Sequence, residues 1–142
     1  MGRVMTKLKL TNPFDKERAR EGLLPPEQVR TVQVEALVDT GATMLVLPAE
    51  VCRHLGLREA GRRKVRYANG VVAEVPWVGG VWIEILGREM TSDALVEAEG
   101  TTPLIGQIPL EGLDLIVNPK TRDLEVNPAS PDAPLLDLLR AS

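Results

Sequence analysis

The chain contains very little of several residue types that common functions require. Its 142 residues include one cysteine and one histidine, which excludes an internal disulfide and a metal site built from a cluster of histidines. Aromatic residues make up 3% and leave little for stacking on nucleic-acid bases. No apolar stretch approaches the roughly 20 residues that span a bilayer, and the N-terminus lacks the basic-then-apolar pattern of a signal peptide. We therefore expect a cytoplasmic protein with no metal and no cofactor, and with neither a membrane nor a nucleic acid as partner.

The single cysteine and the single histidine stand close together, as Cys52 and His54. Nucleophilic catalysis would need their side chains in contact. A helix is predicted over 48–55, and side chains two residues apart on a helix point to different faces. We expect Cys52 to be a small core residue and His54 to face solvent.

Hydrophobic residues make up 44% of the chain and charged residues 26%, with a formal net charge of −3. A chain of this length buries about two-thirds of the surface that it exposes when unfolded. This predicts one compact domain over 1–127, in which the charged, proline-bounded stretch 11–30 is a surface loop. Residues 128–142 predict a proline-rich linker and a short helical tail, whose four leucines could pack on their own subunit, which we favour, or on a partner subunit.

Apolar and polar residues alternate in most of the other segments, which indicates strands separated by glycine-rich turns. Pro48 predicts the start of a short helix that ends at Gly56. The basic run 62–66 predicts a solvated strand face, because its charges alternate with apolar positions. Strands are predicted over 4–10, 31–38, 64–67, 71–75, 81–86, 90–97, 113–117 and 123–126, mostly as an antiparallel meander.

The most informative motif is Asp39-Thr40-Gly41, which follows the predicted strand over 31–38. Asp and Gly are also the commonest turn formers, so the triplet alone could mark an ordinary turn. Its flanks favour a different interpretation: Leu37 and Val38 precede it and the apolar run 44–47 follows it, which indicates a buried strand on each side. A surface turn rarely has such flanks.

A carboxylate on a buried turn suits acid–base hydrolysis when two such turns meet. Two carboxylates at hydrogen-bonding distance cannot both ionise, so they share a proton, and one acts as base while the other acts as acid. Asp39 is the candidate for this role. The Thr40 hydroxyl can hydrogen-bond backbone groups below the carboxylate, and Gly41 permits a tight turn and close approach of a second chain.

Two further segments accompany the motif in chain order. Residues 103–106, Pro-Leu-Ile-Gly, place two apolar residues before a glycine. Residues 67–72 place Asn69-Gly70 between strand-like runs, which is the strongest short-range signal of a β-hairpin. A hairpin at this point could close over an extended substrate and exclude water from the carboxylates.

With these three segments in order, the chain resembles the retropepsin-like aspartic proteases, the small single-domain type found in prokaryotes as well as in retroviruses, over roughly 4–126. The resemblance implies a mainly β fold, a closed antiparallel β-barrel with a flap hairpin and one or two short helices. It implies that Asp39 is catalytic and that Thr40 and Gly41 complete the catalytic turn, with Thr40 bracing the paired turns. It implies that substrate is bound by Ala42, Thr43, Ala68, Asn69, Gly70, Leu104, Ile105 and Gly106.

Two positions depart from the viral pattern. Thr43 stands where viral enzymes often have an acidic residue, and Gln107 stands where they often have an arginine. The ion pair between those positions cannot form here, so the outer subsites and the interface details are not carried over.

One Asp-Thr-Gly in 142 residues, without an internal repeat, supplies half of a two-carboxylate site. The resemblance therefore implies a homodimer in which Asp39 of each subunit meets at the two-fold axis. We expect an endopeptidase that acts on a protein or peptide substrate.

Two functions of other classes stay open from the sequence. A module of the same fold could bind extended peptides or mediate dimerisation without cutting, although such a module has no physical need for two close carboxylates. A regulatory β protein for small ligands would be monomeric and would not need Asp39. Tyr67, Trp77 and Trp82 flank the predicted hairpin, and core packing is the expected role of each, with substrate contact as the alternative for Tyr67.

Overall fold

The computed structural model describes residues 3–138. The strands are β1 (Met5–Thr11), β2 (Thr31–Val38), β3 (Leu45–Pro48), β4 (Glu59–Arg66), β5 (Val72–Ile85), β6 (Arg88–Glu97), β7 (Leu104–Ile105), β8 (Leu115–Val117) and β9 (Leu124–Val126). The helices are α1 (Pro13–Arg20), the 3-10 turn η1 (Pro26–Gln28), α2 (Ala49–Leu55) and α3 (Gln107–Gly112). The mainly β prediction is confirmed, whereas the expectation of one or two helices is wrong, because α1, α2 and α3 are all present.

The strands pair in the order β1-β2-β7-β3-β6-β5-β4, and β1 also pairs with β5, so that the pairing of the first six closes into a ring. The predicted antiparallel arrangement holds for most pairs but not for all, because β2 pairs with β7 and β3 pairs with β6 in parallel. The reason is that β7 lies between β2 and β3, which are consecutive in the chain but separated in the sheet. β7 is parallel to β2 and antiparallel to β3.

The ring encloses one apolar core, to which most strands contribute alternate residues. On β1, for example, Leu8 and Leu10 are fully buried while Lys7 and Lys9 face solvent. The largest fully buried side chains are Leu8, Leu10, Leu45, Leu47, Leu55, Val81, Ile83, Ile85, Ile105, Pro109 and Leu113.

The segment 11–30 is not the surface loop that its charges and prolines suggested, because it contains α1 and η1. Asn12 caps α1 by accepting a hydrogen bond from the Asp15 amide at 3.0 Å. Pro13 follows at the first helical position, where its missing N–H costs nothing. The Asn12 side chain also donates to the Leu55 carbonyl at 2.8 Å and so joins α1 to the end of α2.

The prediction for α2 is confirmed. Pro48 is its N-cap residue, and Gly56 ends it in the left-handed conformation with φ of 68°. Cys52 is buried and His54 is exposed, as expected. Burial raises the pKa of the Cys52 thiol to about 11, so this cysteine is protonated at neutral pH.

The predicted break at residues 79–80 is a bulge within one continuous strand, β5. The register with β6 shifts between Val78 and Val81, and Gly80 adopts φ of 59° there. The Gly80 amide donates to Asp93 Oδ1 at 3.1 Å. A glycine pair can therefore bend a strand without ending it, because a neighbouring side chain accepts the hydrogen bond that the ladder loses.

The β8–β9 hairpin forms as predicted and makes a separate two-stranded sheet. The predicted helical tail does not form: residues 134–138 are not helical, and Leu135, Leu136 and Leu138 are exposed. Leu139, the fourth leucine, lies outside the described residues. The Leu135 amide donates to Asp114 Oδ2 at 3.0 Å, a contact that ties the chain down in an extended form.

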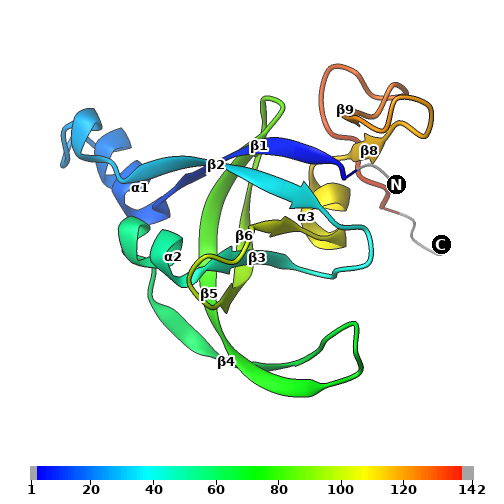
Figure 1. Ribbon diagram of the computed structural model, residues 1–142. Coiled ribbons are helices and arrows are strands. Elements are labelled where there is room, and N and C mark those ends of the chain that lie inside the picture. Colours follow the sequence, from blue (N-terminus) through cyan, green and yellow to red (C-terminus); the bar gives the residue numbers. More distant parts are fainter. Residues whose placement is uncertain (1–2, 139–142) are drawn as a thin grey trace.

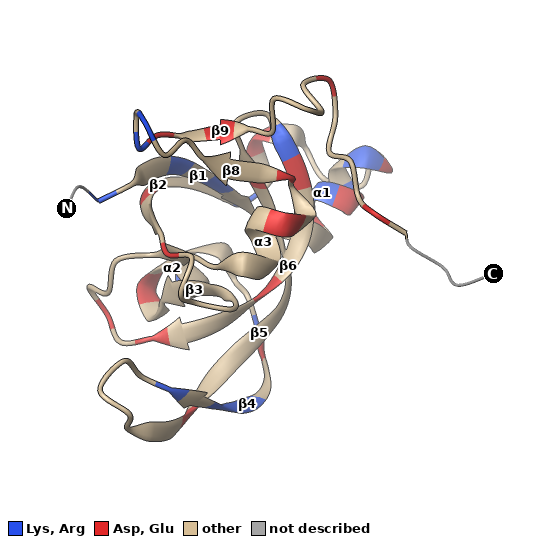
Figure 2. Ribbon diagram, turned by 90° about the vertical axis from the view of Figure 1, so that its right-hand side faces the viewer, with Lys and Arg blue, Asp and Glu red and all other residues tan. Residues whose placement is uncertain are grey.

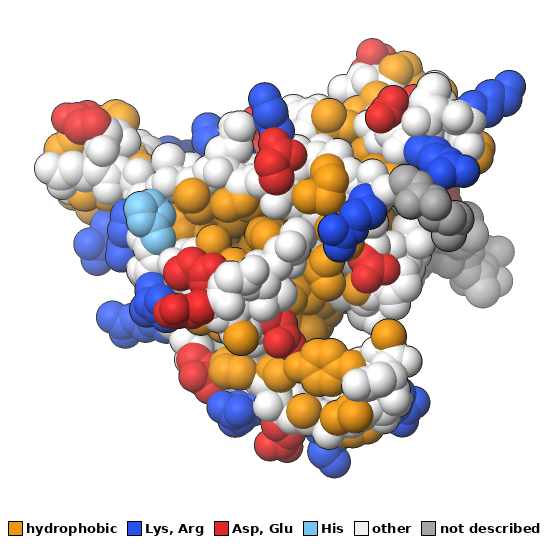
Figure 3. Space-filling model, in the orientation of Figure 1, with side chains coloured by type: hydrophobic (Ala, Val, Ile, Leu, Met, Phe, Trp, Pro, Cys, Tyr) orange, Lys and Arg blue, Asp and Glu red, His pale blue; other side chains and the backbone are white. Residues whose placement is uncertain are grey.

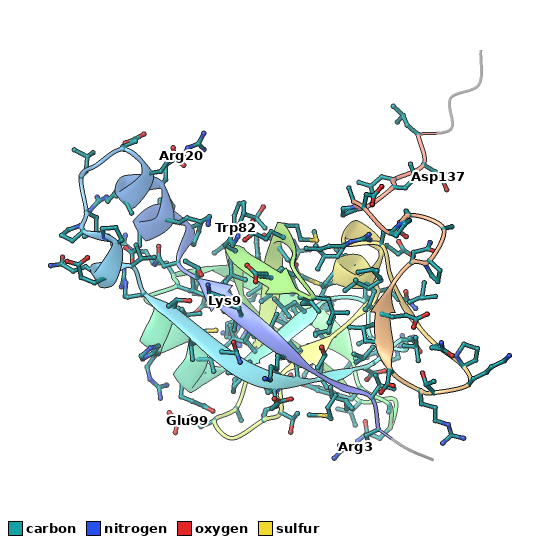
Figure 4. All side chains as sticks on the ribbon, turned by 90° about the horizontal axis from the view of Figure 1, so that it is seen from above. Arg3, Lys9, Arg20, Trp82, Glu99 and Asp137 are labelled. Atoms are coloured by element: carbon teal, nitrogen blue, oxygen red, sulfur yellow. The ribbon has the colours of Figure 1, made fainter. Side chains whose placement is uncertain are left out.

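The α1 segment and the C-terminal segment lie at opposite ends of the molecule, where Figure 4 labels Arg20 and Asp137. Figure 1 shows the same arrangement, with α1 at one end and β8 and β9 at the other. Across residues 3–138, no helix is long and apolar enough to cross a membrane.

Candidate active site

The Asp39 turn, residues 39–44, connects β2 to β3. It begins where β2 ends, next to the parallel pairs that β2 forms with β7, Leu37↔Leu104 and Val38↔Ile105. The Asp39 amide then donates to the Ile105 carbonyl at 3.0 Å. Because β2 and β7 belong to the closed ring, the backbone of Asp39 is held by the rigid part of the fold.

The turn itself is closed by two hydrogen bonds to Asp39. The Ala42 amide donates to the Asp39 carbonyl at 3.1 Å, and the Gly41 amide donates to Asp39 Oδ1 at 2.9 Å. A side chain at Gly41 would begin 3.2 Å from the same oxygen and would crowd the carboxylate. Asp39 is half-buried, so its carboxylate is oriented by the turn while it stays accessible.

Gly106 lies directly against this turn. A Cβ atom at position 106 would fall 2.5 Å from the Met44 carbonyl oxygen and 2.7 Å from the Ala42 carbonyl oxygen. Real Cβ atoms essentially never approach other heavy atoms so closely, and both contacts are to backbone that cannot rotate away. The glycine is thus required by the close approach of two chain segments, since its own φ of −92° is ordinary.

The start of α3 supplies the hydrogen bonds that hold the rest of the turn. The Gln107 amide donates to the Ala42 carbonyl at 2.8 Å, and the Ile108 amide donates to the Thr43 carbonyl at 2.9 Å. The Gln107 side chain donates through Nε2 to the Thr40 carbonyl at 2.8 Å. Amides in the first turn of a helix have no partner within the helix, and here the Asp39 turn provides the acceptors.

The role of Gln107 was missed at the level of sequence. This position was considered only as one where viral enzymes often have an arginine. The signal that could have found it is a helix start directly after Gly106, since free amides at a helix start need acceptors nearby. Gln107 and Thr40 are 67 residues apart, so their contact follows only from the fold.

The second component is the hairpin arm, residues 59–77, formed by β4 and the first part of β5. At its tip, the Tyr67 amide donates to the Val71 carbonyl at 2.9 Å, and the Val71 amide donates to Asn69 Oδ1 at 3.0 Å. Gly70 adopts φ of 84°, which favours glycine. The tip residues 68–70 are all exposed.

Figure 1 shows the hairpin tip and the Asp39 turn on the same side of the molecule. In Figure 3, the arm stands away from the body across a hollow, and hydrophobic side chains cover the arm beside it. The structure therefore brings residues 39–43 and 104–106 into direct contact, whereas residues 68–70 face them from across the hollow, with no hydrogen bond between the two groups in the described part of the chain.

A family model described as gag-polyprotein putative aspartyl protease matches residues 27–112, which is more than half of the 142-residue chain. The chain belongs to this aspartyl protease family. The resemblance to the retropepsin-like aspartic proteases is thereby confirmed. No curated protein sequence matches the chain.

The matched region of this aspartyl protease family member contains every part of the candidate site. It begins within η1, ends with α3, and includes β2, the Asp39 turn, the hairpin arm and Gly106. Strand β1, helix α1 and the β8–β9 hairpin lie outside it.

One chain contributes one carboxylate to this turn. Residues 40–47 and 101–110 contain no Asp or Glu, so the turn and the segment that holds it carry no acidic side chain except Asp39. Over residues 3–138, no cluster of three or more His, Cys, Asp and Glu side chains is placed to hold a metal ion. A two-carboxylate site at this turn would therefore need its second carboxylate from outside these segments.

A pocket of about 320 Å³ lies beside the far end of the turn and does not include Asp39. Met44 ends the Asp39 turn and Ile108 lies in the first turn of α3, so the pocket adjoins the candidate site. Arg63, which lies 4.5 Å from the centre of the Trp77 ring, contributes from the arm. Its lining residues are Met44, Arg63, Gly80, Met90, Thr91, Ser92, Asp93 and Ile108.

Proposed function

We propose that this protein is a homodimeric aspartic endopeptidase that hydrolyses peptide bonds with water activated between two Asp39 carboxylates, one from each subunit. The observation that carries the proposal is the Asp39 turn, in which a half-buried, accessible carboxylate is fixed by Gly41, Gly106 and Gln107. Membership of an aspartyl protease family supports the class of reaction.

In the proposed reaction, the two carboxylates share one proton. The ionised carboxylate takes a proton from the bound water, which attacks the peptide carbonyl carbon. The protonated carboxyl gives its proton to the carbonyl oxygen. The carboxyl that took the proton of water then gives it to the leaving nitrogen, while the other carboxylate takes a proton back from a hydroxyl of the tetrahedral intermediate. The C=O bond re-forms and the peptide C–N bond breaks, which leaves the two carboxylates sharing one proton again.

The proposal of a homodimer follows from the single carboxylate of each chain. A symmetric dimer places the same residue of both subunits at its two-fold axis, so one turn per chain suffices for a complete site. The Thr40 side chain is exposed on the turn, where it can brace the partner's turn. The exposed tip of the hairpin arm, residues 68–70, would cover the substrate from the opposite side.

The proposed substrate groove combines residues that the fold brings together around Asp39. Ala42 and Thr43 continue the turn, and β7 lies against it. An extended peptide could pair its backbone with the hairpin tip, since strand addition satisfies the hydrogen bonds of both chains. The groove residues are Ala42, Thr43, Ala68, Asn69, Gly70, Leu104, Ile105 and Gly106.

The test is fragment production from a peptide library, measured by mass spectrometry from acidic to neutral pH, for wild type and for Asp39→Asn. We expect cleavage by the wild type and a loss of at least about 10³-fold in the variant, because amide cannot act as base or share a proton. Sedimentation of Asp39→Asn should show an intact dimer. Equal turnover by both proteins would contradict the mechanism, and no cleavage by a verified dimer would favour the peptide-binding alternative.

A further inference from the structure

The hairpin arm leaves the body of the protein at a definite point. β5 and β6 pair as far as Trp77↔Leu95, and β6 then continues along β3 with the pair Pro48↔Glu97. Beyond Trp77, β5 pairs only with β4. The outer part of the arm, residues 60–76, is thus a two-stranded ribbon, and such a ribbon is marginally stable by itself.

One side-chain hydrogen bond connects this ribbon to the body within the described residues. The Tyr67 hydroxyl donates to Glu97 Oε1 at 2.6 Å. Within residues 3–138, it is the one hydrogen bond between residues 60–76 and the chain outside the arm, since the other side-chain bonds of this segment stay within the arm. The acceptor lies on β6, which is part of the closed ring and therefore fixed.

The alternation of side chains explains why Tyr67 points toward the body. Val65 pairs with Ala73, both are half-buried, and Val75 on the same face is buried. Arg62, Lys64 and Arg66 occupy the other face and are exposed, and Figure 2 shows basic residues along β4. Tyr67 follows with the same parity as Val65. The core role expected for Tyr67 is wrong, because its side chain stays 39% exposed and spans between arm and body.

Other acidic side chains near the end of β6 are engaged elsewhere. Glu99 forms an ion pair with Arg53, and Glu50 accepts the Gly100 amide at 2.9 Å. Of these acidic side chains, Glu97 is therefore the one that accepts a hydrogen bond from the arm. The hydrogen bond to Glu97 raises the pKa of Tyr67, so its hydroxyl stays protonated and able to donate through the neutral pH range.

We propose that Tyr67 is a positioning residue, which holds the hairpin tip over the Asp39 turn through its hydrogen bond to Glu97. This inference rests on the proposed protease function for its consequence in catalysis. Tyr67 immediately precedes the tip residues 68–70, so a bond at Tyr67 limits how far the tip can swing. The arm is then already in position when substrate binds, so less conformational entropy of the arm is lost on binding.

The first experiment measures the position of the arm without using peptidase activity. Trypsin cleaves after Arg62, Arg63, Lys64 and Arg66, all on the arm, and it needs β4 to separate from β5, which a ribbon no longer held to the body does more readily. We expect Tyr67→Phe and Glu97→Ala each to raise the rate of cleavage within 62–66 by about fivefold, the effect of losing one exposed hydrogen bond of ordinary net strength.

Two controls make this result specific. The double variant Tyr67→Phe/Glu97→Ala should be cut no faster than either single variant, because both changes remove the same bond. Glu99→Ala removes a carboxylate two residues away that does not contact the arm, and its rate should equal that of the wild type. Equal rates for wild type, Tyr67→Phe and Glu97→Ala would overturn the proposal, as would additive effects in the double variant.

The second experiment measures peptide cleavage by the same variants. We expect KM to rise about fivefold while kcat changes less than twofold, because the arm must be ordered during binding while the carboxylates are unaffected. Faster tryptic cleavage with an unchanged KM would overturn the positioning role. If the wild type cleaved no peptide at all, the proposed function would fail, whereas the trypsin result would still decide whether Tyr67 holds the arm.

Discussion

Gly106 shows at the scale of single residues how closely the site is built. Its hydrogen atoms occupy space in which a methyl group would meet backbone atoms of Ala42 and Met44. Gly106 directly follows β7, which pairs with both β2 and β3. Its backbone therefore cannot shift by the several tenths of an ångström that a methyl group needs. Gly106 contributes no catalytic atom, yet its lack of a side chain determines the position of the Asp39 carboxylate.

We predict that Gly106→Ala destabilises the protein by about 3 kcal/mol, the upper range for an overpacked core position, and abolishes cleavage. Urea unfolding measures the first effect. Gly79→Ala is the matched control, because a Cβ there meets its nearest neighbour at an ordinary 3.7 Å. It should cost less than about 1 kcal/mol. Equal stability of the two variants would refute the packing argument.

At the scale of elements, the junction of α1 and α2 depends on contacts from distant parts of the chain. Asn12 caps α1 and also donates to the last carbonyl of α2. Arg30, just before β2, pairs with Asp15 of α1 at 2.8 Å, and this pairing lowers the pKa of Asp15. A Cβ at Gly56, which ends α2, would lie 1.8 Å from Arg30 Nη1.

Gly56→Ala should therefore destabilise the protein in two ways. The left-handed backbone at φ of 68° costs about 1–2 kcal/mol for a residue with a side chain, and the methyl group displaces Arg30 from Asp15. Thermal unfolding of Gly56→Ala in wild-type and Arg30→Ala backgrounds separates the two. We expect the cost to be smaller in the Arg30→Ala background, and an identical cost in both would show that backbone strain acts alone.

The C-terminal segment is attached through Asp114, whose carboxylate accepts from Ser130, from Asn127 Nδ2 at 3.0 Å and from the Leu135 amide. Arg88, buried in the body, donates to the carbonyls of Leu113 and Asp114 at 3.0 and 2.9 Å. The hydrogen bonds that the Asp114 carboxylate accepts, above all the one from Ser130, lower the pKa of Asp114 to about 2.

Because the pKa of Asp114 is lower in the folded chain than its usual value of about 3.9 when unfolded, its stabilising effect is complete above about pH 4. It is lost as the pH falls toward 2. Asp114→Asn should be less stable than the wild type at pH 5, and the difference should narrow by pH 2. Asparagine tolerates the left-handed conformation of position 114, so the comparison tests charge. A constant difference in urea midpoint across this range would contradict the assignment.

At the scale of the whole molecule, one chain is half of the proposed site. A peptide carrying a statine, whose hydroxyl stands in for the attacking water of the tetrahedral intermediate, should bind between the two Asp39 carboxylates. We predict one molecule bound per dimer, measured by calorimetry at concentrations at which sedimentation shows the dimer. One molecule per subunit would mean that each chain has a complete site and would contradict the shared active site.

Local signals in the sequence predicted much of the fold. The alternation over 31–38 predicts β2 with its observed bounds, and Pro48 and Gly56 delimit α2 as expected. Two errors came from signals with more than one meaning: Asn12-Pro13 begins a helix as well as a turn, and Gly79-Gly80 marks a bulge as well as a break. The predicted helical tail does not form over 134–138, and the contact of the Leu135 amide with Asp114, 21 residues earlier, could not be predicted from local sequence.

The amino-acid sequence by itself determined which residue types can carry the chemistry: one carboxylate on a buried turn, without a histidine cluster or a second acidic side chain beside it. It also determined the hairpin, because Asn69-Gly70 acts through local conformation. Only the tertiary structure decided that β7 lies between β2 and β3, that Gln107 holds Thr40, and that Tyr67 meets Glu97. The physical reason is that these contacts join residues 30 to 67 positions apart, which chain closure brings together and no local pattern encodes.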